Sequence, residues 1–180
     1  RDCDWVVEVV LEDLGIKHTT YEKITRDLKK GAIVSSNTST IPLEMLTQKM
    51  KPEHKKNFLI THFFTPPRYL RLLEIVTGKD TDPAKAKEVI EFCDVKLGKG
   101  VVRCKDTPGF IVSRILTFFM QSALNVAVSD NVSIEVADAV LSKPVGIPKT
   151  GVFGLIDLVG VDLMPHLAHS LLSALPEGDQ

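Results

Sequence analysis

The chain has 180 residues, of which 44% are hydrophobic and 25% are charged, and its formal net charge is −1. This ordinary composition predicts a globular protein, and the lack of a basic excess argues against nucleic-acid binding. No apolar run approaches the roughly 20 residues that a membrane-spanning helix needs, so we expect no membrane span.

The first 50 residues alternate between strand-like and helix-like patterns. Residues 4–10 (DWVVEVV) form a short, β-branched run that predicts a buried strand. Residues 12–28 have apolar positions near helical spacing, and Gly31 lies just beyond them, where a helix ends. A second buried strand is expected at 32–36 and a short helix at 42–50. This alternation favours an open α/β sheet.

The next segment predicts a hairpin. Residues 57–64 and 70–77 are both strand-like, and the segment between them (TPPRY) is too short for a crossover helix. The two strands should therefore pair antiparallel. A helix is expected at 82–97, with Asp82 as its cap and Pro83 at its first position, followed by one more strand at 100–104.

Helical patterns follow Asp106. Helices are expected at 108–129, from Ser133 onward, at 153–159 and at 162–175. Pro and Gly in the segment KDTPG (105–109) interrupt the change from strand to helix. We therefore predict two domains, covering residues 1–105 and 106–180.

His62 and Glu74 form the first candidate pair for chemistry, in the apolar runs FLITHFF and LRLLEIV. A lone histidine in a strand is commonly a satisfied core residue, and Glu74 can equally face water on an edge strand. If the hairpin turns about Arg68, however, the two residues lie directly opposite, with Cβ atoms about 4.5–5.5 Å apart. The carboxylate then accepts a hydrogen bond from one ring nitrogen and makes the other a better general base. A register shift of one residue would separate the pair.

The polar segment SSNTST (35–40) directly follows a strand that we expect to be buried. Open α/β sheets bind ligands at the carboxyl ends of their parallel strands, where hydroxyl and amide side chains can hydrogen-bond a substrate oxygen. An ordinary polar turn is the plain alternative. No GxGxxG motif connects a strand to a helix, because Gly98 and Gly100 precede a strand.

The three cysteines, Cys3, Cys93 and Cys104, are widely spaced and odd in number. This pattern favours reduced thiols in a cytosol or an organelle matrix over a disulfide framework. No CxxC motif or Cys/His cluster has metal-ligand spacing, so we expect no metal site.

Four motifs, taken in order, resemble the 3-hydroxyacyl-CoA dehydrogenases of fatty-acid β-oxidation. They are SSNTST (35–40), THFFTPP (61–67), LLEIV (72–76) and GKGVVRCKDTPGFIVSR (98–114). The resemblance covers essentially the whole chain. RYLRLLE, GKGVV and GIPKTGVF are most similar to the multifunctional bacterial members, which join this dehydrogenase to an enoyl-CoA hydratase. The resemblance implies NAD-dependent oxidation of (S)-3-hydroxyacyl-CoA to 3-ketoacyl-CoA.

The resemblance also implies catalytic roles for individual residues. His62 is the implied general base for the substrate's 3-hydroxyl proton, Glu74 is its partner, and Ser39 contacts the substrate oxygen. Ser113 stands in GFIVSR at the position of a family asparagine that helps to hold the substrate. Serine is shorter and has no amide N–H, so we expect reduced activity or altered positioning and an unchanged reaction.

For the cofactor, the resemblance implies that Glu12, Lys17 and Asn37 contribute to NAD binding, the first two through the ribose. From the residues alone, Glu12 can instead be a carboxylate favoured at a helix start, and Lys17 a solvated lysine. The family begins with a βαβ unit whose glycine-rich loop receives the NAD pyrophosphate. No such unit precedes Arg1, so we expect an N-terminally truncated enzyme with impaired NAD binding.

The expected fold is therefore α/β. It comprises the C-terminal half of a Rossmann-type NAD-binding sheet ending in an antiparallel hairpin (1–105) and a small all-helical dehydrogenase domain (106–180). The expected partners are a 3-hydroxyacyl-CoA substrate and either a second copy or further domains of a longer chain, in a bacterial cytoplasm or a mitochondrial matrix. Two alternatives stay open: another NAD-dependent β-hydroxyacid dehydrogenase, or a non-catalytic assembly module built on the apolar segment 110–128.

Overall fold

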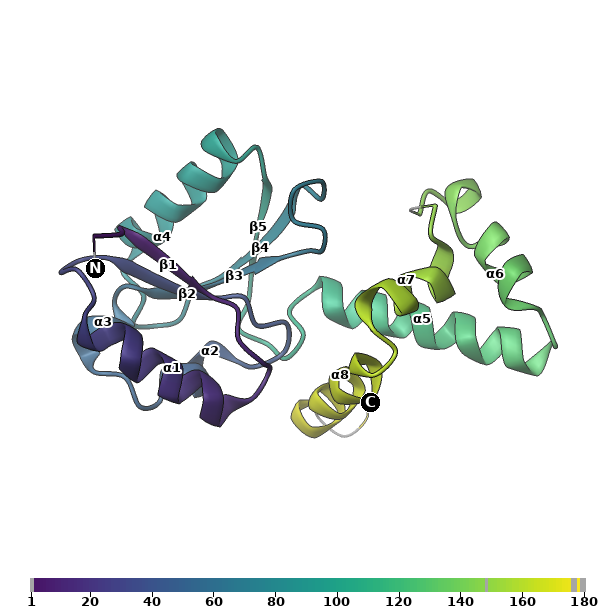
Figure 1. The fold of residues 1–180 in the computed structure, drawn as a ribbon, viewed down its shortest axis with the longest axis horizontal. Helices are drawn as coiled ribbons and strands as arrows, with labels where there is room; N and C mark the ends of the chain where they lie inside the picture. Colours follow the sequence, from purple (N-terminus) through teal and green to yellow (C-terminus); the bar gives the residue numbers. More distant parts are fainter. Residues whose placement is uncertain (1, 148, 176–177, 179–180) are drawn as a thin grey trace. The chain divides into compact units, whose positions relative to one another are not determined.

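Five strands form one mixed sheet in the first part of the computed structural model, which describes residues 2–147, 149–175 and 178. In spatial order they are β1 (Trp5–Glu8), β2 (Ile33–Ser36), β3 (Phe58–Phe63), β4 (Leu72–Val76) and β5 (Gly100–Cys104) (Figure 1). Neighbouring strands run parallel except β3 and β4, which pair antiparallel as predicted. The sheet does not end at this hairpin, because β5 pairs with the far side of β4. The chain divides into two compact units, Arg1–Phe110 and Ile111–Gln180.

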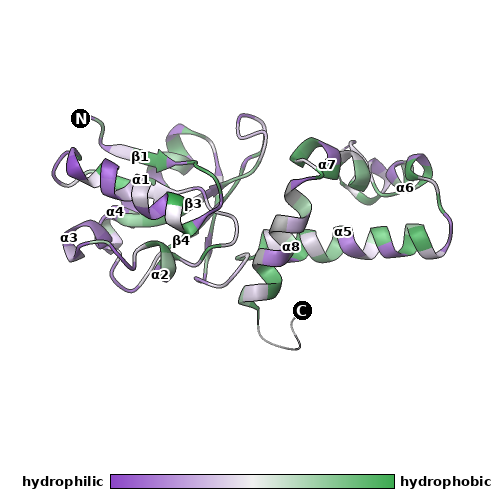
Figure 2. Cartoon of the chain, turned by 60° about the horizontal axis from the view of Figure 1, so that its bottom comes forward, coloured by the Kyte–Doolittle hydropathy of each residue, from purple (hydrophilic) through white to green (hydrophobic). Residues whose placement is uncertain are grey.

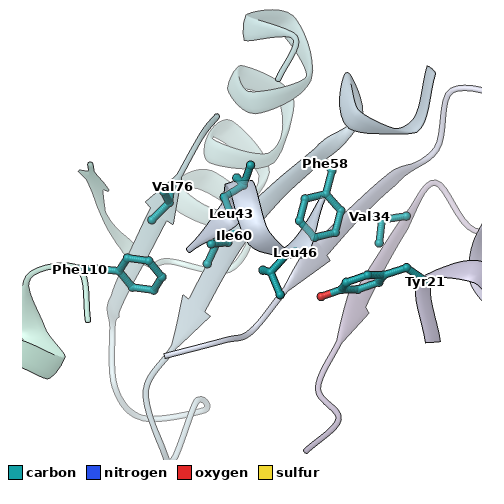
Figure 3. Packing of buried hydrophobic residues seen from close by; sticks show 8 residues of the cluster. All are labelled: Tyr21, Val34, Leu43, Leu46, Phe58, Ile60, Val76 and Phe110. Carbon is teal, nitrogen blue, oxygen red and sulfur yellow. The ribbon is translucent and has the colours of Figure 1, made fainter. Parts of the chain in front are cut away.

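Helices cover both faces of this sheet. One face packs against α1 (Leu14–Arg26) and α2 (Leu43–Leu46). The other face packs against α4 (Pro83–Glu91) and the π-helical turn η1 (Phe92–Lys96). The short helix α3 (Pro52–Lys55) follows α2 in the sequence. Alternate strand residues point to opposite faces, so coverage of both faces explains why every residue of β2 and all but the last residue of β3 are buried. Figure 3 shows the first of the two cores, formed by Tyr21, Val34, Leu43, Leu46, Phe58, Ile60, Val76 and Phe110.

Capping side chains set the helix starts in this unit. The Asp13 carboxylate accepts a hydrogen bond from the backbone N–H of Ile16 at 2.8 Å, so α1 begins at Leu14 and not at residue 12. Asp82 caps α4 in the same way, with Pro83 at the first helical position, as predicted. The short helix α3 had no predicted counterpart.

The second unit is helical. It contains α5 (Val112–Ser129), α6 (Ile134–Val140), the 3-10 turn η2 (Lys143–Val145), α7 (Gly151–Val159) and α8 (Leu163–Ala174). The predicted helix start at 108 is wrong. Gly109 and Phe110 have φ angles of 72° and 45°, in the left-handed region, so a right-handed helix cannot run through them.

The core of the second unit is formed by Met120, Ala123 and Val152. Asp138 ties α6 to α7 by accepting hydrogen bonds from the backbone N–H groups of Phe153 and Gly154 at 2.7 and 3.0 Å. Many apolar residues lie along these helices (Figure 2), and Phe118 on α5 is 76% exposed. Among the described residues, none of the helices combines the length and apolar character needed to cross a membrane.

Candidate active site

His62 on β3 lies directly opposite Glu74 on β4, which confirms the register predicted from the turn at residues 65–69. The His62 Nδ1 atom lies 2.7 Å from Glu74 Oε2. Both side chains are buried, Glu74 completely and His62 at 5% exposure. A carboxylate only accepts hydrogen bonds, so Nδ1 is the donor and a neutral His62 ring carries its lone pair on Nε2.

Two aromatic rings and a thiol surround this pair. The His62 ring packs against Phe64 and Phe110, with ring centroids 4.4 and 5.9 Å apart. The Cys104 Sγ atom lies 3.6 Å from Glu74 Oε1, on the oxygen that does not contact the histidine. Burial and the neighbouring Glu74 charge raise the pKa of the Cys104 thiol to about 12, so it stays protonated and can donate to the carboxylate. The imidazole is thus held in one orientation.

Ser39 stands at the free nitrogen of His62. It follows β2, and its Oγ atom lies 3.1 Å from His62 Nε2. In the neutral ring with the proton on Nδ1, Nε2 carries the lone pair and the serine hydroxyl is the donor in this contact. Sequence reasoning placed Ser39, His62 and Glu74 in one site, and the three side chains do form a continuous line of contacts.

The Glu12 carboxylate holds the turn that carries Ser39. Its Oε1 atom accepts hydrogen bonds from the backbone N–H groups of Ser39 and Thr40 at 3.0 and 3.2 Å, and from the Thr38 hydroxyl. The side chain of Glu12 is 36% exposed, so part of it still faces solvent. Glu12 therefore links the end of β1 to the turn after β2.

Lys17 is buried, so the alternative that it is a solvated surface lysine is wrong. Its side chain is 1% exposed, and its ammonium lies 2.9 Å from Glu8 Oε1 and 3.2 Å from Glu12 Oε2. The other Glu8 oxygen accepts hydrogen bonds from the hydroxyls of Tyr21 and Ser36, both at 2.6 Å. Burial raises the pKa of Glu8, but the hydrogen bonds from Ser36, Tyr21 and Lys17 outweigh burial and keep the pKa below its ordinary value.

Sequence reasoning did not find Glu8 or Cys104. Glu8 sits in the run VVEVV much as Glu74 sits in LLEIV, and a carboxylate in an apolar strand needs a partner. Lys17, nine residues along, was the available signal. Cys104 offered no comparable signal, since its contact depends on the pairing of β5 with β4.

The remaining site predictions concern Asn37 and Ser113. The Asn37 Oδ1 atom accepts a hydrogen bond from the backbone N–H of Phe63 at 2.9 Å, which turns its amide nitrogen away from β3. Ser113 is buried near the start of α5, in the second unit. Within the part of the chain that the structure describes, no cluster of three or more His, Cys, Asp or Glu residues is suited to hold a metal ion.

The carboxyl ends of β1 and β2 offer groups that fit the ribose end of a nicotinamide dinucleotide. Glu12 presents a partly exposed carboxylate, which is the group that accepts hydrogen bonds from ribose hydroxyls. Asn37 adds an amide nitrogen at the neighbouring strand end. The glycine-rich motif that receives a pyrophosphate does not occur in the sequence.

Two family models match the chain. Residues 1–107 match the model described as 3-hydroxyacyl-CoA dehydrogenase, NAD binding domain. Residues 109–180 match 3-hydroxyacyl-CoA dehydrogenase, C-terminal domain. The chain is also 41% identical over 179 residues to a Rickettsia prowazekii protein described as a fatty acid oxidation complex trifunctional enzyme. This match covers 99% of the chain and 25% of the relative, so the chain spans about a quarter of that protein.

Solved structures give the same result. FadB2 of Mycobacterium tuberculosis superposes with a TM-score of 0.86 at 32% identity, covering 96% of this chain and 60% of that one. The (S)-3-hydroxybutyryl-CoA dehydrogenase of Ralstonia eutropha superposes with a TM-score of 0.82 at 27% identity, covering 95% and 59%. Because the two family models together match both the sheet-containing unit and the helical unit, the chain belongs to the 3-hydroxyacyl-CoA dehydrogenase family.

Proposed function

We propose that the protein containing this chain oxidises (S)-3-hydroxyacyl-CoA to 3-ketoacyl-CoA with NAD, in the oxidation of fatty acids. The observation that carries this proposal is the line of contacts from Ser39 Oγ to His62 Nε2 and from His62 Nδ1 to Glu74. A histidine with one nitrogen fixed by a buried carboxylate and the other facing a hydroxyl is poised to accept a hydroxyl proton.

The side chains have separate parts in this reaction. The 3-hydroxyl of the substrate takes a place beside Ser39 and gives its proton to His62 Nε2. Glu74 keeps the ring in the productive tautomer and stabilises the imidazolium that forms. Phe64 and Phe110 limit the access of water to the ring. NAD, when bound, supplies the acceptor for the hydride from the third carbon.

For the cofactor we propose that Glu12 accepts hydrogen bonds from the ribose hydroxyls and that Asn37 donates through its amide. Lys17 acts through Glu12 in this proposal, because its ammonium is buried against carboxylates. The five strands are the later part of a dinucleotide-binding sheet, and we place its glycine-rich unit outside these 180 residues, since no GxGxxG occurs within them. NAD binding by these residues alone should therefore be weak.

Ser113 is proposed to help hold the substrate in place of the asparagine expected there. A serine hydroxyl reaches less far than an amide, so a bridging water takes over part of the contact. We further propose the bacterial cytoplasm as the site of action, in keeping with the bacterial relatives.

A second role, as an assembly module, is favoured by one observation. An open apolar groove between α5 and α6 is lined by Val126, Val132, Val136 and Val140. Val126, Val136 and Val140 are each more than half exposed. A second copy or a further domain of a longer chain would cover such a surface. Light scattering of the chain across concentrations tests this role, and a monomer throughout would argue against it.

The proposed reaction is tested by following NADH absorbance with the intact protein. (S)-3-hydroxybutyryl-CoA should be oxidised, whereas its (R) isomer and free 3-hydroxybutyrate should not. Turnover of the free acid at a similar rate would favour the alternative, another β-hydroxyacid dehydrogenase. NADH formation with none of the three would contradict the proposal.

A further inference from the structure

Glu8 is a buried carboxylate that the proposed reaction does not use. Glu8 is 3% exposed, and each of its two carboxylate oxygens accepts two hydrogen bonds. Oε1 accepts hydrogen bonds from Lys17 Nζ at 2.9 Å and from the backbone N–H of Val10 at 2.7 Å. Oε2 accepts from the hydroxyls of Tyr21 and Ser36. Such a fully satisfied buried charge is costly to build and points to a specific task.

A chain of contacts leads from Glu8 to the catalytic histidine. The Lys17 ammonium lies between the carboxylates of Glu8 and Glu12, at 2.9 and 3.2 Å. Glu12 in turn accepts hydrogen bonds from the backbone N–H groups of Ser39 and Thr40. Ser39 Oγ then meets the ring nitrogen Nε2 at 3.1 Å. Charges of alternating sign thus connect the end of β1 to the turn that holds the active-site serine.

We propose that Glu8 is a positioning residue for Ser39. By holding the Lys17 ammonium, Glu8 keeps it from collapsing onto Glu12. The Glu12 Oε1 atom then stays available to the N–H groups of Ser39 and Thr40. These two hydrogen bonds fix the position of the Ser39 hydroxyl relative to His62 Nε2. Without the Glu8 charge, Lys17 pairs with Glu12 alone and competes with the turn for the same carboxylate. This rests on the proposed function only in calling Ser39 part of an active site.

Amide hydrogen exchange of the isotope-labelled chain, measured by NMR, tests the proposal without substrate or cofactor. Glu8→Gln should speed exchange of the Ser39 and Thr40 amides by roughly three- to thirtyfold, which lies within the range expected for groups coupled through one network. Tyr21→Phe is the matched control, because it removes a hydrogen bond from the same carboxylate on the side away from Lys17. Tyr21→Phe should leave these two amides unchanged. An equal effect of both variants would overturn the proposal, since it would show a packing defect only.

The route through Lys17 is tested by a double-mutant cycle. In a Lys17→Met background, adding Glu8→Gln should cause no further change in the exchange rates of the Ser39 and Thr40 amides. The Lys17 ammonium, which connects Glu8 to Glu12, is already absent in that background. An undiminished effect of Glu8→Gln there would contradict the proposed route. If Glu8→Gln does not fold, Glu12→Gln serves instead, since Glu12 is partly exposed. That variant must then shift the side-chain carboxyl resonance of Glu8, and an unmoved resonance would overturn the coupling. These measurements use neither substrate nor cofactor, so they test the role of Glu8 even if the enzyme assay contradicts the proposed function.

Discussion

Lys17→Met removes the buried ammonium and leaves the Glu8 carboxylate, with no solvent exposure of its side chain, without its cationic partner. Breaking a buried ion pair from one side commonly costs about 3–5 kcal/mol. Glu8 keeps the donors Tyr21, Ser36 and the backbone N–H of Val10, and methionine fills most of the lysine volume. We therefore expect the lower end of the range, a loss of about 3 kcal/mol in the free energy of unfolding at neutral pH.

The pH dependence of this loss has a definite sign. Burial raises the pKa of Glu8, but its hydrogen bonds, including that from Lys17, bring the pKa below the ordinary value of 4.5 in the folded protein. A carboxylate with a lowered pKa contributes stability above its unfolded pKa and loses it as the pH falls through the folded pKa. Lys17→Met removes one cause of the lowering, so Glu8 takes up its proton at a higher pH in the variant. The difference between variant and native chain should therefore shrink below about pH 4.5.

Urea unfolding followed by tryptophan fluorescence measures this effect. Trp5 is the single tryptophan and lies on β1, so its signal reports on the first unit. Lys29→Met is the matched control, because the Lys29–Asp4 pair is exposed at 50% and 80% of its side chains. The control should show no measurable change in the urea midpoint. A loss for Lys17→Met that stays the same from pH 7 to pH 4, or no loss at all, would refute the reasoning.

Three further predictions concern other residues. Ser113→Asn in the intact protein should lower KM for the acyl-CoA substrate by about three- to tenfold, the value of one hydrogen bond. Steady-state kinetics measures this change, and an unchanged or raised KM would contradict the prediction. At pH 8 a disulfide reagent should modify the exposed Cys3 quickly and the other two thiols slowly, because burial raises the pKa of Cys93 to about 11 and that of Cys104 to about 12; fast modification of three thiols would contradict this. Asp82→Ala should cost about 1 kcal/mol of stability through loss of the α4 cap, and an unchanged urea midpoint would count against it.

The sequence predicted the pairing of His62 with Glu74 because its determinants are local. The segment between residues 64 and 70 is too short for a crossover, so the strands must form a hairpin. The turn length then fixes which residues face each other. Helix caps were equally readable, as Asp82 shows, since a cap depends on neighbours within three residues. The exceptions are the starts of α1 and α5. The Asp13 cap of α1 was missed, and the left-handed conformation of Phe110 has no signature in its residue type.

The contacts of the charged network around Glu8 could not be read from the sequence, although Lys17 nearby was a signal that Glu8 has a partner. Its members come from β1, α1 and β2, and their contacts depend on how α1 packs across the sheet. A lysine on the first turns of a helix usually faces water, and only the packing of α1 turns Lys17 inward. The contact of Cys104 with Glu74 likewise requires the register of β5 on β4.

The most direct test of the central claim is the turnover of a His62→Gln variant of the intact protein with (S)-3-hydroxyacyl-CoA and NAD. Glutamine is close to histidine in volume but cannot accept the hydroxyl proton, so kcat should fall by roughly 10²–10⁴-fold, the usual contribution of a general base. NAD binding, measured by calorimetry, should stay unchanged because His62 lies outside the proposed ribose contacts. Turnover within about fivefold of the native protein, well short of the contribution of a general base, would contradict the assignment of His62 as the catalytic base.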